Sequence, residues 1–215
     1  MEITWLGHSC FRIKTKEATV IMDPYSKMEG LDLGRPKADI VTVSHDHPGH
    51  NNVSSVKGGD DLKVITGPGE YEIKGLFITG VRTYHDKQLG KKLGKNTVYL
   101  IETEGLVLAH LGDLGHVLDE EQADLMSEVD ILLIPVGGGN SLGAEEAVEV
   151  ISQIEPSIVI PMHYKTGPGQ ANLEGIERFC KEMGLTNWQV EDKLVVRKSD
   201  FGEQTEVKIL AVKAN

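Results

Sequence analysis

The chain has 215 residues, with 22 lysines and arginines against 33 aspartates and glutamates, so its net charge is −11. Such a surface repels phosphate backbones and anionic lipids, which argues against nucleic acid and membrane partners. Residues 1–5 lack the basic and apolar regions of an export signal, and no uncharged run approaches about 18 residues, so we expect a cytoplasmic protein. We expect one domain over residues 1–215, with Cys10 and Cys180 as free thiols because they match no paired spacing.

Short β-type runs and helical segments alternate along the chain. The runs 2–6, 10–14 and 18–22, separated by turn residues, predict an antiparallel meander, and 97–102 with 106–110 predict a hairpin. Helices are expected at 119–128, 143–154 and 172–183, with strands at 131–136 and 157–160 between them. Strands outnumber helices and the two kinds mix, which favours sheets sandwiched by helices over a doubly wound sheet.

Histidine and aspartate side chains follow four of the apolar runs, at the point where each run ends. These candidate ligands are His45, His47, His50, His85, Asp113 and His163. Imidazole and carboxylate groups on loops at strand ends suit a first-row divalent metal, because the strands fix the ligand positions while the loops leave one face open. The sequence therefore predicts a metal site.

The segment 45–50 is the most informative part of the chain. In an extended segment, His45 and His47 point to the same side about 6–7 Å apart, so both imidazoles can reach one ion. Pro48 and Gly49 then break the strand, which turns His50 back toward the same pocket. The alternative is three solvated histidines in a polar loop, but three histidines within six residues after an apolar strand favour metal binding.

The run His45-Asp46-His47-Pro48-Gly49-His50 is similar to the His-x-His-x-Asp-His pattern of the metallo-β-lactamase superfamily, with glycine in place of the aspartate. Other motifs of the family are matched in order by Asp23, His85, Asp113 and His163. The opening Trp5-Leu6-Gly7-His8-Ser9 resembles the ascorbate-6-phosphate-lactonase-like branch. The resemblance covers residues 1–185.

This resemblance implies an α/β fold, the four-layer αββα sandwich, with a metal site at one edge of the sheets. It places His45, His47 and His85 on one ion and His50 and His163 on a second, with Asp113 bridging the two. Zn²⁺ is the expected metal, with Mn²⁺ or Fe as alternatives. A metal-bound water, whose pKa falls toward about 7, would then act as a hydroxide nucleophile.

The resemblance further implies a hydrolase that cleaves an ester-like, lactone or phosphodiester bond in a small molecule. Two other interpretations stay open: an iron-dependent redox protein on the same fold, and a non-catalytic or regulatory metal-binding protein. A homo-oligomer is compatible with the sequence.

Gly49 departs from the family pattern, because glycine offers no ligand to the second ion. That ion is then bound weakly, bound only with substrate, or absent. We expect Gly49→Asp to raise its occupancy. Asp46 is no substitute, because alternation along the strand turns it away from His45 and His47.

Four further residues are candidates for supporting roles. We expect Asp23 to orient a ligand histidine and His8 to line the site. With Asp113, the candidate catalytic residues are His110, as a hydrogen-bond partner or proton shuttle, and His116, as a substrate contact. The alternatives are a plain strand histidine for His110 and a solvated loop for His116.

Residues 86–96 bring lysines beside His85 in an otherwise acidic chain. They are Lys87, Lys91, Lys92 and Lys95. A mobile cationic loop of this kind, with Lys91 and Lys92 at its centre, favours a substrate that carries phosphate or carboxylate. The alternative is a solvated hairpin tip whose lysines serve solubility.

Overall fold

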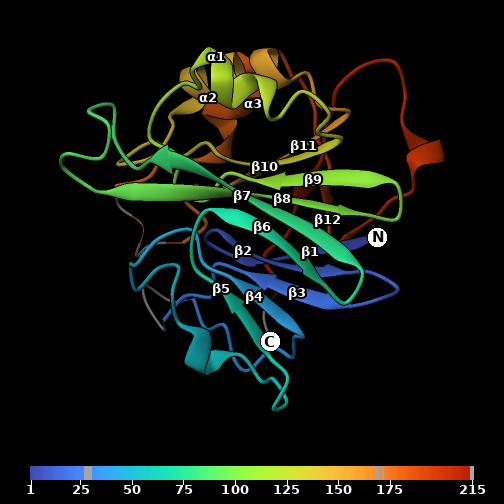
Figure 1. Ribbon diagram of the computed structural model, residues 1–215. Helices are drawn as coiled ribbons and strands as arrows, with labels where there is room; N and C mark the ends of the chain where they lie inside the picture. The colour runs from blue at the N-terminus through green and yellow to red at the C-terminus, as the bar shows by residue number, and fades with distance from the viewer. Residues whose placement is uncertain (27–30, 168–169, 171, 214–215) are drawn as a thin grey trace.

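Two mixed β-sheets pack face to face in the computed structural model, which describes residues 1–26, 31–167, 170 and 172–213 (Figure 1). The first sheet has the strand order β13 (Leu194–Val195), β1 (Glu2–Gly7), β2 (Cys10–Lys14), β3 (Thr19–Met22), β4 (Ile40–Thr42) and β5 (Lys63–Ile65). The second has the order β14 (Glu206–Val207), β11 (Ile158–Met162), β10 (Ile131–Pro135), β9 (Leu106–His110), β8 (Lys95–Thr103), β7 (Leu76–Tyr84) and β6 (Gly69–Ile73). Near the C-terminus β12 (Val190–Glu191) pairs with β15 (Ile209–Leu210).

The predicted meander and hairpin are both confirmed. β1, β2 and β3 pair antiparallel in sequence order, and so do β8 and β9. Glu104 and Gly105 join β8 to β9 with φ values of 54° and 72°, and two positive φ values at a two-residue turn match the twist of the flanking strands.

Three α-helices fall within the segments predicted to be helical. They are α1 (Glu120–Asp124), α2 (Ala144–Ile154) and α3 (Ile176–Glu182), of which α1 and α3 are shorter than expected. Asp119 caps α1 as predicted, accepting a hydrogen bond from the Gln122 backbone N–H. In the described residues, no helix is long and apolar enough to cross a bilayer, and both cysteines are free and buried.

The layers are unequal on the two outer faces. Figure 1 shows α1, α2 and α3 gathered on the outer side of the seven-stranded sheet, and the five residues of β10 and of β11 are all buried. The outer face of the six-stranded sheet carries a smaller apolar cluster that includes Leu6, Ile21 and Val41. Loops and the 3₁₀ turn η1 (Val53–Ser55) cover that cluster. The sandwich predicted from the sequence is thus confirmed.

Strand direction explains where the candidate ligands lie. In the first sheet β1, β3 and β4 run the same way, and in the second β7, β9, β10 and β11 do. Residues that follow the carboxyl ends of parallel strands meet at one edge of a sheet. His8, Asp23 and His45 follow strands of the first sheet, whereas His85, Asp113 and His163 follow strands of the second.

Candidate metal centre

Asp113 lies at the centre of a ring of histidines contributed by both sheets. Its Oδ2 is 3.1 Å from His50 Nε2, 3.4 Å from His85 Nε2 and 4.0 Å from His45 Nε2. Its Oδ1 is 3.2 Å from His163 Nε2. One buried carboxylate therefore faces four imidazoles, of which His45 and His50 share a loop while His85 and His163 come from loops far away in the sequence.

Asp23 fixes the orientation of two of these histidines from behind. Its carboxylate accepts hydrogen bonds from Ser44 N at 2.7 Å, Ser44 Oγ at 2.6 Å and His50 Nδ1 at 2.7 Å. Ser44 Oγ lies 3.0 Å from His45 Nδ1. The hydroxyl proton of Ser44 is donated to Asp23, so Ser44 Oγ accepts a hydrogen bond from the Nδ1–H of His45. In neutral His45 and His50, the Nε2 lone pairs then point toward Asp113.

Ser141 orients His163 in the same way. Its hydroxyl donates to the Gly138 carbonyl at 3.1 Å, so its oxygen accepts the Nδ1 proton of His163, which lies 3.3 Å away. Nε2 of His163 is left as an acceptor, and it faces Asp113 Oδ1.

Acceptors that face acceptors in a buried site need a cation between them. His45 Nε2 and Asp113 Oδ1 are buried without a hydrogen-bond partner in the described residues, and Asp113 Oδ1 faces the Nε2 acceptor of His163 at 3.2 Å. Leaving such atoms unpaired is costly, whereas divalent metals are bound by neutral imidazole nitrogen and carboxylate oxygen. The donor set present here therefore fits a divalent ion.

The charges within the centre are strongly coupled. Burial alone would lower the pKa of His50, but Asp113 and Asp23 outweigh it and raise that pKa to about 10. Burial, with His50 beside it, lowers the pKa of His45 to about 4. Burial would raise the pKa of the Asp113 carboxyl, but His163 and His50 hold it well below its usual value. Asp113 is thus an anion at neutral pH.

The six residues predicted as metal ligands all come together, and His8 joins them. Among the described residues, three groups have ligand atoms within 4.8 Å of one another: His45 with His47 and His50, His45 with His85 and Asp113, and His8 with His50 and His163. His47 is the exposed member, and its ring stacks 5.8 Å from that of His45. Asp46 is exposed and pairs with Asn51, consistent with its expected turn away from the site.

His110 and His116 have both ring nitrogens bonded to backbone groups. His110 Nε2 donates to the Ser9 carbonyl at 2.8 Å, and its Nδ1 accepts from Gly112 N at 3.2 Å. His116 Nδ1 donates to the Val117 carbonyl at 2.7 Å, and its Nε2 accepts from Tyr84 N at 3.2 Å. These bonds leave neither ring a free nitrogen for proton transfer or for substrate.

Several residues that support the centre were not anticipated from the sequence. Asn96 Oδ1 accepts from Asp113 N at 3.0 Å, and Ser44 and Ser141 hold ligand rings as described above. Ser44 directly precedes His45 at a strand end, which was a usable signal. Asn96 and Ser141 gave none, because their partners are 17 and 22 residues away.

Strained backbone is concentrated at this edge. Non-glycine residues with positive φ include His8 at 53°, Asp23 at 46° and His163 at 53°. Conformations of this kind persist only where the surroundings enforce them, and they cluster at functional sites. The backbone N of His163 donates to the His8 carbonyl at 3.2 Å, which ties the two sheets together.

The lysine-rich loop is held by Asp86. The carboxylate of Asp86 accepts hydrogen bonds from four backbone N–H groups, those of Gln88, Gly90, Lys92 and Leu93. These four bonds set the conformation of the turn that carries the lysines. It borders a cavity of about 380 Å³, whose lining includes Lys87, Lys92 and Ser141 but not Lys91.

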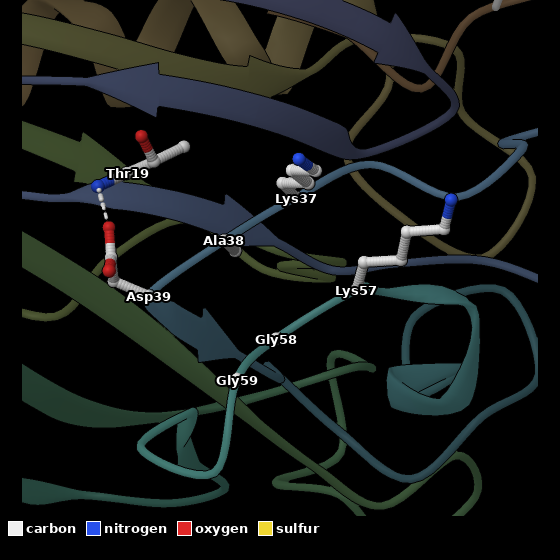
Figure 2. A pocket seen from close by; sticks show the side chains of 7 residues that line it. All are labelled: Thr19, Lys37, Ala38, Asp39, Lys57, Gly58 and Gly59. Atoms are coloured by element: carbon white, nitrogen blue, oxygen red, sulfur yellow. Dashed lines mark hydrogen bonds between the residues drawn. The ribbon is translucent and has the colours of Figure 1, made fainter.

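A second cavity, of about 390 Å³, lies at the opposite ends of the strands (Figure 2). Thr19 begins β3 and Asp39 immediately precedes β4, whereas Asp23 and His45 follow the other ends of the same strands. Figure 2 shows the Asp39 carboxylate beside the backbone N of Thr19. The Asp39 carboxylate accepts a hydrogen bond from Thr19 N at 2.8 Å and also pairs with Lys74, which lies outside this view. This cavity contains none of the candidate ligands.

Known proteins are similar to this chain in both sequence and fold. A family model described as the beta-lactamase superfamily domain matches residues 2–163. A UPF0173 protein of Pyrococcus abyssi is 33% identical, over 83% of this chain and 90% of its own. A UPF0173 metal-dependent hydrolase of Methanopyrus kandleri is 28% identical, over 86% and 94%. The crystal structure of a candidate Zn-dependent hydrolase from Thermotoga maritima has a TM-score of 0.79 at 36% identity, covering 97% of each chain. The chain therefore belongs to the metallo-β-lactamase superfamily, as its motifs predicted.

Proposed function

We propose that the protein is a metal-dependent hydrolase that holds two divalent ions, with Zn²⁺ as the preferred metal, around Asp113. The observation that carries this proposal is the Asp113 carboxylate, whose two oxygens face the Nε2 atoms of His50, His85 and His163 at 3.1–3.4 Å. His45, His47 and His85 would hold one ion, and His50 and His163 the other. Relatives named as metal-dependent hydrolases support the same assignment.

When bound, such ions act as Lewis acids that polarise a carbonyl or phosphoryl oxygen and lower the pKa of water. The residues of this chain position them: Asp113 carries the negative charge between the two sites, while Asp23 and Ser44 keep the proton of His45 away from Nε2. His110 and His116 are each bonded twice to backbone groups and are not assigned a catalytic step.

The proposed substrate is a small anionic molecule with an ester-like, lactone or phosphodiester bond. The cavity beside the centre is lined by two lysines and two acids, but the Asp86 carboxylate is occupied by four backbone N–H groups. Lys92 has no ion-pair partner in the described part of the chain, so its charge is left to attract an anion. Lys87 lines the same cavity but pairs with Glu146. Ser141, which contacts His163, connects this cavity to the metal ligands.

Metal content and hydrolysis should be lost together when a ligand is removed. Elemental analysis of protein purified without added metal or chelator gives the identity and number of ions, and lactone, phosphodiester and thioester substrates test the reaction. His47→Ala and Asp113→Ala should lose metal and activity, whereas His116→Ala should keep its metal. Full metal content in Asp113→Ala would contradict the bridging role.

Substrate charge is tested by reversing one lysine at a time. Lys92→Glu should raise KM for an anionic substrate several-fold without changing the metal content, and the effect should shrink with added salt, which screens the charge. Lys91→Glu is the matched control, because Lys91 is on the same turn but does not line the cavity. Equal KM values for the two variants at low salt would contradict the role of Lys92.

A further inference from the structure

The space beside Gly49 is filled by His8. A Cβ atom on Gly49 would lie 2.9 Å from His8 Nε2 and 3.1 Å from His47 Nδ1. Gly49 is buried, but its φ is outside the left-handed region, so backbone conformation alone does not require glycine here. The imidazole of His8 therefore occupies the volume that a side chain at position 49 would enter.

The backbone of His8 is held in place from two directions. Its carbonyl accepts hydrogen bonds from Trp5 Nε1 at 2.9 Å and from His163 N at 3.2 Å, and its φ is 53°. A positive φ at a non-glycine residue persists only where neighbouring contacts enforce it. These contacts direct the ring toward the ligands of the proposed second ion, with centroids 4.2 Å from His163 and 5.0 Å from His50.

The ring of His8 has free binding capacity. The residue is only 7% exposed, and its Nδ1 is buried without a hydrogen-bond partner in the described residues. The ligand atoms of His8, His50 and His163 lie within 4.8 Å of one another. A histidine that served only to pack would be expected to have its buried nitrogens satisfied, as both nitrogens of His110 are.

We infer that His8 is a ligand of the second ion, beside His50, His163 and Asp113, in place of the carboxylate that the family pattern provides at position 49. The inference rests on the two-ion centre proposed above. It also changes the expected effect of Gly49→Asp: the new carboxylate and the His8 ring compete for one volume, so this substitution alone should not raise occupancy.

Replacing a carboxylate by a neutral imidazole has two chemical consequences. The centre carries one negative charge fewer, which strengthens its attraction for an anionic substrate. Imidazole also suits Zn²⁺, whereas carboxylate suits Mn²⁺ better, so the second site should discriminate against Mn²⁺.

Zn²⁺ and Mn²⁺ titrations against a competing chelator test the inference on the parent protein and four variants. His8→Ala should weaken the second Zn²⁺ by about 100-fold, because even partners outside the ligand set contribute 10- to 100-fold. Gly49→Asp alone should also weaken it. The double variant His8→Ala/Gly49→Asp should recover most of the loss and shift preference toward Mn²⁺. His116→Ala, a histidine bonded only to backbone groups, is the control and should bind as the parent does.

The ring ¹⁵N resonances of His8 in the parent protein give a second readout that does not depend on any variant folding. One of them should move by tens of parts per million when Zn²⁺ fills the second site. Unchanged His8 resonances, or a His8→Ala protein that binds two ions with the affinities of the parent, would overturn the inference while leaving the metal centre intact. A parent protein that binds no ion would instead overturn the proposed function.

Discussion

Asp23 controls which ring nitrogens of His45 and His50 carry protons, so Asp23→Asn tests whether these protonation sites determine metal affinity. The carboxylate is fully buried and accepts from Ser44 N at 2.7 Å, Ser44 Oγ at 2.6 Å and His50 Nδ1 at 2.7 Å. An amide keeps only one acceptor oxygen. When that oxygen retains the Ser44 N–H, the amide NH₂ faces Ser44 Oγ and His50 Nδ1, and both of these atoms must become acceptors.

The resulting tautomers place protons where the metal should bind. His50 then carries its proton on Nε2, and Ser44 Oγ, which now donates, moves the proton of His45 to Nε2 as well. Restoring either lone pair in order to bind an ion leaves two donors facing each other, which costs about 1–3 kcal/mol. His45 and His50 belong to different proposed ions, so both dissociation constants should rise, each by about 10- to 100-fold.

Chelator competition with Zn²⁺ measures both dissociation constants, and ¹⁵N spectra of the metal-free protein report which ring nitrogens of His45 and His50 carry protons. Asp130→Asn is the matched control: Asp130 is also buried and accepts from Val107 N at 2.9 Å, but it contacts none of the ligands. It should lower stability and leave the metal affinities unchanged. Parent-like affinities in Asp23→Asn, or equal losses in the two variants, would refute the reasoning.

Two other predictions concern stability. Gly137→Ala would place its Cβ 2.2 Å from the His163 carbonyl oxygen, so it should destabilise the protein by about 1–3 kcal/mol in denaturant unfolding. Gly59→Ala is the control, because its Cβ would meet no atom within 4 Å, and it should leave the free energy of unfolding nearly unchanged. Equal losses of stability in the two variants would contradict the clash at Gly137. In the metal-free protein, the free energy of unfolding should rise with pH between about 4 and 6.5. Burial lowers the pKa of folded His45 to about 4, so in this range His45 is protonated in the unfolded chain but neutral in the folded protein. The free energy of unfolding should then fall above pH 6.5, by up to about 1.4 kcal/mol per pH unit. In this range folded His50, with a pKa of about 10, still holds a proton that the unfolded chain has released. Bound Zn²⁺ should abolish the alkaline fall measured in thermal melts, and a fall that persists would show that His50 is not a ligand.

The strands that precede the ligands could be predicted because an apolar run is a local property of the sequence, whereas the position of the site at one edge followed from the family resemblance. Apolar runs ending in histidine mark a strand and the loop beyond it, as for β4 with His45 and β11 with His163. The parallel course of these strands then brings the loops to one edge. Helix ends were less predictable: α1 ends at Asp124 although helical sequence continues, because tertiary packing sets where a short helix stops.

The proton network could not be predicted, because it depends on contacts between residues that are distant in the chain. Ser141 and His163 are 22 residues apart, and Asn96 and Asp113 are 17 apart. Asp23 is an exception, because it was expected to orient a ligand histidine, although the sequence did not identify His50 as its partner. The environment of Gly49 could not be predicted for the same reason. In the sequence it is only a missing carboxylate, whereas in the structure the ring of His8, 41 positions earlier, fills the space. His110 illustrates the converse, since its position near Asp113 suggested chemistry while its two backbone bonds indicate support.

Each sheet supplies part of the centre, so metal binding and sheet packing should be coupled. The strained residues His8 and His163 come from different sheets and are joined by a backbone hydrogen bond of 3.2 Å. Positive φ at such residues costs of the order of 1–3 kcal/mol each, and the unpaired atoms of His45 and Asp113 add to that cost. The apolar contacts between the sheets must offset both contributions when no ion is present. An ion that binds the unpaired atoms from both sheets removes part of this cost, and for that reason metal should stabilise the packing of the whole sandwich as well as its edge.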